Sequence, residues 1–217
     1  MAKKITTAQV FGLPIYKTKI DEKSYEKENI TKIILNNFKK QKIRNKWSLD
    51  SFETNELHHS NMDDDNPKFK KPDYSSLMPV YTKTIKDYFN SMNLKKFNFV
   101  FEVANYTCMT KGNQMSSHIH AKCDFSAIHY LKFDEKTNDS TMFHNRNSYS
   151  KFFNYIYPNI NKIMVNEDIN NSWTFDHFKL ATKEDDFLIY PAVLEHSVPK
   201  IKSNEPRITI VLNINIV

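Results

Sequence analysis

The chain carries three side chains at positions of the same parity that could bind one metal ion. They are His118, His120 and Asp124. In an extended strand, residues two apart project from the same face, so all three could point at a single ion. His196, much later in the chain, is a fourth candidate ligand. Imidazole and carboxylate together suit iron, and also zinc or manganese, so the residue types alone leave the metal open.

The spacing of the apolar residues predicts the elements that position these ligands. One amphipathic helix is expected after Asp21, which can cap it, and another over residues 74–93, where Pro79 either kinks the helix or marks its start. From Phe97 onward the apolar period changes to two, which is typical of strands. We expect strands over residues 9–20, 97–104, 126–133, 140–144, 173–181, 187–191 and 207–217.

Residues 45–73, between the two helices, read as an irregular loop because they are rich in acidic residues and contain prolines. His58 and His59 fall inside this loop and are expected to be solvated. His129 does not share strand parity with Asp124, so we expect it on the face away from the metal.

Two helices followed by closely spaced strands indicate an α+β protein whose β part is a sandwich or barrel. The chain of 217 residues is long enough to bury a core, and 40% hydrophobic with 26% charged residues is typical of a globular protein. We expect a single domain over residues 1–217. Residues 1–93 would supply supporting elements and residues 94–217 the β core with the metal site.

The overall charge and the cysteines bear on partners and compartment. A net charge of +6 permits binding to polyanions without requiring it. Two cysteines are too few for a disulfide framework and favour a reducing compartment. No apolar run reaches membrane-spanning length, and the first residues lack a signal-peptide core. We therefore expect a cytoplasmic protein that makes no membrane contact and is compatible with a homodimer.

The spacing around the metal motif resembles that of cupins. The run from Gly112 through His118 and His120 to Asp124 resembles their first motif, with aspartate in place of the usual glutamate. Residues 191–196 resemble their second motif without its glycines. Both motifs belong to the double-stranded β-helix, a jelly-roll barrel whose mouth holds a metal.

Further segments resemble a family of 2-oxoglutarate and iron(II)-dependent oxygenases found in bacteria and tailed phages. The matching segments are an opening Pro-Ile-Tyr strand within residues 11–16, the histidine pair followed by the strand of residues 125–131, the Leu-Glu-His run ending at His196, and a closing strand with Arg207 and Asn213. The resemblance implies a double-stranded β-helix core with two flanking N-terminal helices. It also implies an enzyme, most often a hydroxylase, that uses Fe(II), 2-oxoglutarate and O2.

The resemblance assigns the metal ligands only in part. His118, His120 and His196 would be the catalytic metal ligands, but the wider superfamily has an aspartate where this chain has His120. It therefore stays open whether Asp124 or His118 completes the shell with His120 and His196. Asp124 can also be read as a turn residue before the next strand.

The resemblance assigns the cosubstrate to the closing strand. Arginine offers a planar fork for the distal carboxylate of 2-oxoglutarate, and an arginine on so apolar a strand is costly unless it is paired. Arg207 is therefore the expected partner, Thr209 can donate to the same carboxylate, and Tyr106 is a further candidate donor.

Two other functions fit parts of the pattern. A cupin-type metalloprotein, either a cosubstrate-independent dioxygenase or an isomerase, would need the metal but not Arg207. A non-catalytic binding module could retain the barrel alone. The sequence does not identify the substrate, which could be a protein, a nucleic acid or a small molecule.

Overall fold

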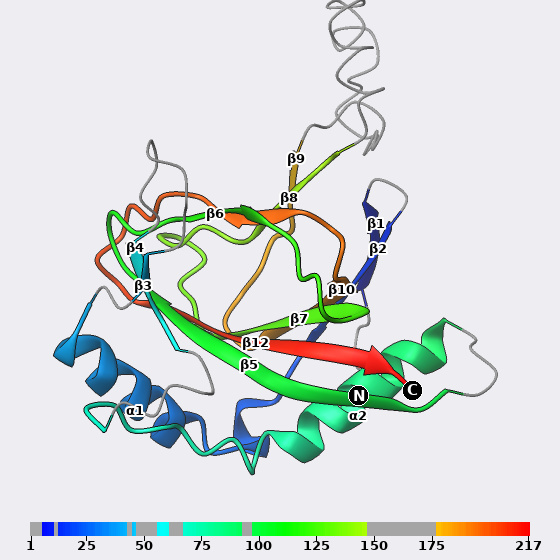
Figure 1. Cartoon of the computed structure of the whole chain (residues 1–217), viewed down its shortest axis with the longest axis horizontal. Coiled ribbons are helices and arrows are strands. Elements are labelled where there is room, and N and C mark those ends of the chain that lie inside the picture. Colours follow the sequence, from blue (N-terminus) through cyan, green and yellow to red (C-terminus); the bar gives the residue numbers. More distant parts are fainter. Residues whose placement is uncertain are drawn as a thin grey trace, which may run out of the picture.

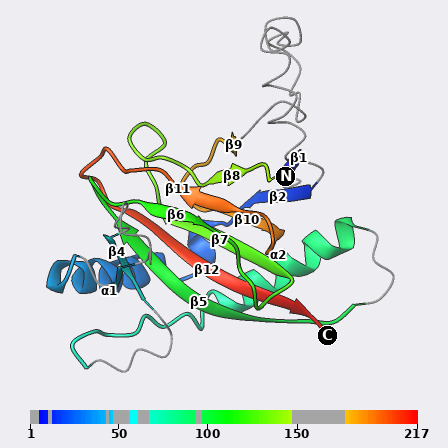
Figure 2. The ribbon, with the colours of Figure 1, turned by 45° about the horizontal axis from the view of Figure 1, so that its top comes forward.

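The computed structural model of the chain describes residues 6–10, 13–42, 45–46, 56–60, 67–92, 97–146 and 177–217. Two antiparallel β-sheets face each other, and two helices cover the outer face of the larger sheet (Figure 1). The larger sheet has eight strands in the order β1-β2-β10-β7-β12-β5-β4-β3, and the smaller has four in the order β6-β11-β8-β9. Figure 2 shows β6 and β11 of the smaller sheet above β7, β12 and β5 of the larger one.

In the second half of the chain, most strands that follow one another alternate between the two sheets. The larger sheet contains Thr6–Val10 (β1), Leu13–Lys19 (β2), Asn45–Lys46 (β3), Glu56–His59 (β4), Phe99–Met109 (β5), Phe125–Lys132 (β7), Asp186–Pro191 (β10) and Arg207–Ile216 (β12). The smaller sheet contains Met115–His118 (β6), Met142–His144 (β8), His177–Lys179 (β9) and His196–Val198 (β11). The alternation from β5 to β8 and from β10 to β12 is the predicted double-stranded β-helix. Over the described residues its strands form two facing sheets and not a closed barrel.

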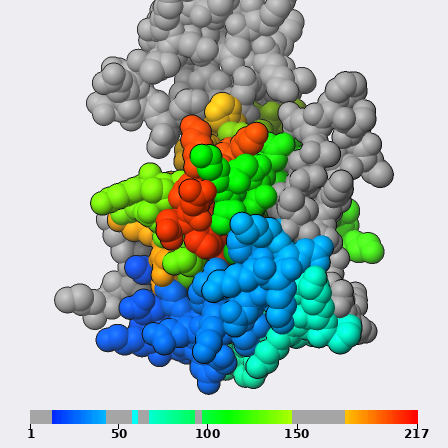
Figure 3. Space-filling view, turned by 90° about the vertical axis from the view of Figure 1, so that its left-hand side faces the viewer, coloured from blue at the N-terminus to red at the C-terminus, as the bar shows by residue number. Residues whose placement is uncertain are grey.

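The first helix packs on the larger sheet through one apolar stripe. A short 3-10 turn, Glu22–Ser24, precedes it, and the carboxylate of Asp21 accepts a hydrogen bond from the Lys23 amide at 3.0 Å. Helix α1 spans Lys27–Lys40, and its apolar residues follow the three-to-four spacing of a helix that buries one face. Figure 3 shows this helix below the segment that joins β11 to β12, drawn in orange to red.

The second helix, α2, spans Met78–Ser91 and begins with Pro79 in its first turn. Proline is tolerated there because the amide it lacks would have no partner in the helix. Of the two interpretations of Pro79, the structure therefore supports the one in which it marks the start of the helix. Together with α1, this helix closes the main hydrophobic core against the outer face of the larger sheet.

Strand β5 changes the face it presents to the core partway along its length. Its register with β12 shifts because Val211 pairs with Asn105 while Leu212 pairs with Val103, which leaves Ala104 as an extra residue. Such a bulge reverses the alternation of side chains beyond it. Val103 and Tyr106 consequently both face the helices, and Asn105 faces the smaller sheet.

Two parts of the N-terminal half differ from the expectation. The predicted edge strand over residues 9–20 is a hairpin in which β1 is the edge and β2 lies between β1 and β10. Residues 45–73 are not irregular throughout, because β3 and β4 extend the larger sheet beyond β5. In the part of the chain that the structure describes, neither helix is long and apolar enough to cross a membrane.

A buried polar network ties the start of α1 to the turn before β10. Asp185, whose positive φ of 65° is uncommon outside glycine, accepts hydrogen bonds from the Tyr25 hydroxyl at 2.6 Å and from the Lys27 ammonium. His129 lies 3.6 Å from the same carboxylate and is hydrogen-bonded to the Tyr81 hydroxyl at 2.8 Å. Burial opposes the ionisation of Asp185, but these donors outweigh it and lower its pKa to about 2.

This network predicts a specific acid sensitivity. The folded pKa of Asp185 lies below the value of about 3.9 in an unfolded chain, so its contribution is complete above about pH 4 and disappears as the pH falls toward 2. The contribution is of order 2 kcal/mol. Denaturant unfolding of wild type and Asp185→Asn should therefore give a difference in unfolding free energy that is largest near pH 6 and shrinks below pH 4. If the difference in unfolding free energy between the two proteins stays constant down to pH 2, the ionised form of Asp185 does not stabilise the fold.

Candidate metal centre

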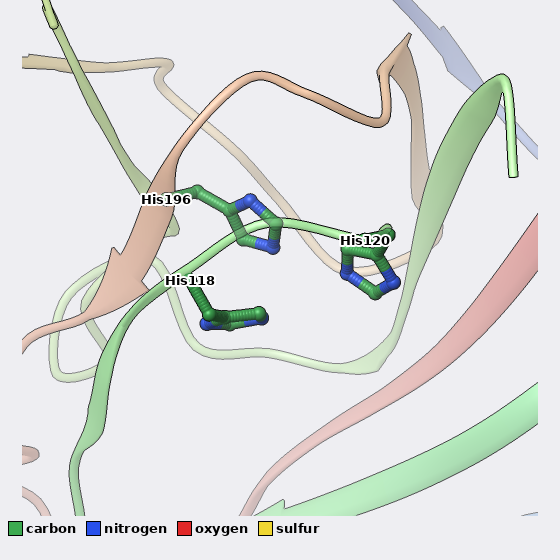
Figure 4. Close-up of side chains that lie close together, drawn as sticks. All are labelled: His118, His120 and His196. Atoms are coloured by element: carbon green, nitrogen blue, oxygen red, sulfur yellow. The ribbon is translucent and has the colours of Figure 1, made fainter. Parts of the chain in front are cut away.

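Three histidines come together where the two short strands of the smaller sheet meet. His118 is the last residue of β6, His196 is the first residue of β11, and the two are paired in register. His120 follows two residues later, and its amide donates to the Ala192 carbonyl at 3.0 Å. One ring nitrogen from each histidine lies within 4.8 Å of the other two. Figure 4 shows the three rings grouped together, two from the segment at the end of β6 and one from β11.

The hydrogen bonds of two of these rings fit a metal site. Nδ1 of His118 lies 2.9 Å from the Ser116 carbonyl, and Nδ1 of His196 lies 2.9 Å from the Leu194 carbonyl. A carbonyl oxygen only accepts, so each Nδ1 carries the proton and each Nε2 keeps a lone pair, which is the usual orientation of metal-binding histidines. Metal–nitrogen bonds of about 2.1 Å hold two nitrogens at most about 4.2 Å apart, so small side-chain rotations suffice to complete the site.

All three rings are neutral at neutral pH. Burial is the main cause, because it disfavours the charged imidazolium, and the pKa of each is lowered. The pKa of His120 falls to about 4, with a further contribution from neighbouring His118. Three neutral imidazoles with available lone pairs form a donor set suited to iron(II) and also to zinc or copper.

Asp124 does not join this group. The chain turns at residues 121–122 after β6 has ended, so the strand parity that links Asp124 to His118 in the sequence does not hold in the structure. The Asp124 carboxylate instead accepts a hydrogen bond from the Ile216 amide at 2.8 Å, and its side chain is exposed. The structure thus places this expected ligand at the end of β12, as an anchor for the start of β7.

A cavity beneath the histidines contains the predicted arginine. It holds about 390 Å³ of space not filled by protein atoms, solvent at its mouth included, and is lined by all three histidines, Arg207 and Thr209. Arg207 is 1% exposed. Its guanidinium donates to the Asp139 carbonyl at 3.0 Å and to the Thr141 hydroxyl at 3.3 Å. It also lies 5.2 Å from the centre of the Tyr130 ring.

This guanidinium forms no ion pair with a carboxylate among the described residues. Its direct contacts there are a carbonyl, a hydroxyl, a thioether and an aromatic ring. The carboxylate of Asp139 favours its charge from a longer distance and is itself paired with Lys179 at 2.9 Å. A fully buried charge is costly unless it is paired. Thr209, on the same face of β12, shares a 2.7 Å hydrogen bond with the Thr107 hydroxyl and adds polar groups to the same wall. The cavity therefore offers a site for an anion next to the three histidines.

Tyr106 does not reach the cavity. Its hydroxyl accepts from the Asn37 amide at 2.8 Å and lies 3.1 Å from Nε2 of His58, on the side of β5 that faces α1. The bulge at Ala104 explains the difference, because an uninterrupted strand would place Tyr106 on the face opposite Phe99 and Phe101. The prediction that Tyr106 contacts the cosubstrate is therefore corrected: Tyr106 packs in the core on the helix side of the larger sheet.

Sequence reasoning missed two residues of the cavity wall. His59, expected in a solvated loop, is buried on β4 and lines the cavity, while neighbouring His58 is buried on the opposite face. Tyr190 lines the cavity from β10, and its hydroxyl lies 3.2 Å from Nε2 of His196. Strand periodicity in residues 187–191 could have placed Tyr190 on an inner face. The prediction for His129 is confirmed, since it faces the helices and not the cavity.

Comparison with known proteins links this site to one family. Residues 105–213 match the model of a family described as "Putative 2OG-Fe(II) oxygenase". This match begins within β5, ends within β12, and includes all three histidines and Arg207. No curated protein matches the chain.

Several solved structures resemble the chain. AviO1 from Streptomyces viridochromogenes superposes with a TM-score of 0.56 at 8% identity, covering 93% of this chain and 89% of AviO1. A prolyl hydroxylase from Trichoplax adhaerens, in complex with a peptide fragment of hypoxia inducible factor, gives 0.51 at 10% identity, covering 99% and 84%. An oxidoreductase of the 2OG-Fe(II) oxygenase family from Burkholderia pseudomallei gives 0.45 at 12% identity, and the match covers 74% of this chain and 66% of that protein. The first two scores show a shared fold.

Proposed function

The chain belongs to the 2OG-Fe(II) oxygenase family, and from this premise we propose that its three histidines hold iron(II) and that Arg207 holds 2-oxoglutarate. Enzymes of this family use Fe(II), 2-oxoglutarate and O2, and this chain is a 2-oxoglutarate-dependent oxygenase. The reaction we propose is the hydroxylation of a carbon atom in the substrate. The individual residue roles rest on the geometry of the cavity.

The observation that carries the assignment of Arg207 is its buried charge. In the described part of the chain no carboxylate is in direct contact with it, whereas 2-oxoglutarate would bring one. A guanidinium binds a carboxylate through two parallel hydrogen bonds, and Thr209 on the next inward position of β12 can donate to the same group. The distal carboxylate of 2-oxoglutarate thus supplies the missing partner.

The ligand set that we propose consists of His118, His120 and His196 without a carboxylate. These three histidines would hold the ion and would leave part of its coordination shell open to the cosubstrate. When bound, iron(II) with 2-oxoglutarate and O2 supplies the oxidation that inserts one oxygen atom into the substrate.

The remaining cavity residues orient the reactants and exclude water. Apolar side chains of Ile128, Val198 and Val211 line the same cavity as the histidines and Arg207. A dry, shaped wall of this kind strengthens the electrostatic contacts made by the guanidinium and limits side reactions. Arg207 therefore fixes one end of the cosubstrate, and the histidines fix the position where its other end reacts.

One feature supports a second function. A set of three histidines with no carboxylate also suits a cupin-type dioxygenase that needs no cosubstrate, and position 120 is where the wider superfamily has aspartate. Such an enzyme would bind the metal without binding 2-oxoglutarate. The unpaired charge of Arg207 favours the first proposal.

A turnover experiment tests the proposal. Protein loaded anaerobically with iron(II) and then given 2-oxoglutarate and O2 should release succinate, and a matching substrate should raise this rate and gain one oxygen atom. The panel should contain prolyl peptides, nucleobases, sugars and small metabolites, with prolyl peptides first because the Trichoplax adhaerens structure contains a peptide. Protein treated with a chelator is the control. Absence of succinate from iron-loaded protein across the whole panel would contradict the proposal.

A further inference from the structure

Tyr190 contacts the ring nitrogen of His196 that a metal ion would need. The Tyr190 hydroxyl lies 3.2 Å from Nε2 of His196, and the two rings meet edge to face with centres 5.0 Å apart. Tyr190 is fully buried on β10, in the apolar cluster between the two sheets. The hydroxyl therefore has a fixed place beside the three histidines.

The direction of this hydrogen bond follows from the other side of the His196 ring. Nδ1 faces the Leu194 carbonyl at 2.9 Å and so carries the ring proton. In the neutral ring Nε2 then has a lone pair and no proton, and the Tyr190 hydroxyl must be the donor. Without this donor the lone pair of a buried histidine, which is 3% exposed, would lack a partner whenever no metal is bound.

A metal ion and the Tyr190 hydroxyl compete for the same lone pair. Once an ion binds Nε2, the hydroxyl must move off the lone-pair direction, while the contacts of its ring with Phe143 and His196 keep it nearby. Adding a metal–nitrogen bond of about 2.1 Å to the 3.2 Å contact puts the hydroxyl no more than about 5.3 Å from the ion. A ligand oxygen on that ion would then lie within reach of a hydrogen bond from the hydroxyl.

We propose that Tyr190 is a positioning residue that caps Nε2 of His196 in the metal-free protein and donates a hydrogen bond to 2-oxoglutarate in the metal-loaded protein. The second half of this statement rests on the proposed function. The exchange keeps the buried hydroxyl satisfied in both states. It also couples the arrival of the metal to the completion of the cosubstrate site.

The proposal predicts effects of opposite sign in one variant. Tyr190→Phe keeps the ring and removes only the hydroxyl, so the metal no longer has to displace a hydrogen bond. Its affinity for manganese(II), used as a stable substitute for iron(II), should rise about fivefold, the equivalent of a hydrogen bond of about 1 kcal/mol. The affinity of the manganese-loaded variant for 2-oxoglutarate should fall about fivefold for the same reason. General damage to the site would weaken both.

Tyr81→Phe is a matched control, because Tyr81 is another fully buried tyrosine whose hydroxyl is hydrogen-bonded to a histidine, at 2.8 Å from His129. It lies on the helix side of the larger sheet and should change neither affinity, although it lowers the melting temperature. Both ligands are titrated calorimetrically into wild type and the two variants.

The two halves of the result are judged separately. Tighter manganese(II) binding with weaker 2-oxoglutarate binding in Tyr190→Phe alone supports the proposal. Unchanged or weaker manganese(II) binding in Tyr190→Phe overturns it, and so does an unchanged affinity for 2-oxoglutarate. If manganese-loaded wild type fails to bind 2-oxoglutarate, the proposed function fails, while the metal titration still decides whether Tyr190 caps His196.

Discussion

Replacing Arg207 by alanine should leave the metal bound and weaken 2-oxoglutarate by about thirtyfold or more. The guanidinium is buried in the wall of the cavity and is not one of the three side chains that would bind the metal. Losing a buried, charge-assisted pair typically costs on the order of 2–5 kcal/mol, and about 1.4 kcal/mol corresponds to a factor of ten. Calorimetric titration of the cosubstrate into manganese-loaded protein measures the change.

Two further variants make this result specific. Arg207→Lys should recover only part of the affinity, since an ammonium lacks the planar fork. Arg146→Ala removes an exposed arginine that pairs with Glu195 and does not line the cavity, so it should keep the wild-type affinity for 2-oxoglutarate. If both Arg207 variants lose stability and metal binding together, Arg207 is a structural residue and does not bind the cosubstrate.

Replacing His196 by alanine should lower metal affinity by about a hundredfold or more. Even residues that only support a metal ligand commonly change affinity by about 10–100-fold, and His196 would be a ligand itself. Its ring is the most buried of the three and is held by the Leu194 carbonyl. Equilibrium dialysis with iron(II) under anaerobic conditions gives the affinity.

The same measurement decides the role of Asp124. Asp124→Asn keeps an oxygen that can accept from the Ile216 amide, so the fold should persist and the metal affinity should stay within a few fold of wild type. His144→Ala is the control for loss of a histidine from the smaller sheet, because His144 lies on β8 and does not line the cavity. Loss of metal from Asp124→Asn would restore the carboxylate ligand that the sequence pattern suggested.

The sequence predicted those parts of the site that depend on simple alternation. Arg207 and Thr209 share one face of a regular strand, so their common orientation follows from the period of two. The family match also spans the histidine pair and His196, whose distance in the chain is bridged by the pairing of β6 with β11. Resemblance to known motifs, rather than spacing alone, connected the two segments.

The errors arose where the backbone departs from a regular strand. Asp124 lies an even number of residues from His118 and His120, as a ligand on the same strand face would. The turn after β6 interrupts the strand, so this spacing no longer places Asp124 on the same side. Tyr106 has the parity of a cavity residue, but the extra residue in β5 reverses its face. Neither the turn nor the bulge is marked by a glycine or proline at that point in the sequence.

The strand that carries His58 and His59 was missed for a different reason. Its four residues have no apolar alternation, and they form a strand because β5 offers an edge with which to pair. One histidine then becomes part of the cavity wall and the other part of the core. A strand that is stabilised by tertiary pairing rather than by its own residues leaves little local signal.

One titration tests most directly whether the three histidines and Arg207 form a single site. 2-Oxoglutarate is titrated anaerobically into iron(II)-loaded protein and into protein freed of metal with a chelator. We predict one molecule bound per chain in the presence of iron(II), and much weaker binding without it, because the metal and Arg207 hold opposite ends of the same molecule. No binding to the iron-loaded protein, or equal binding with and without iron, would contradict this account.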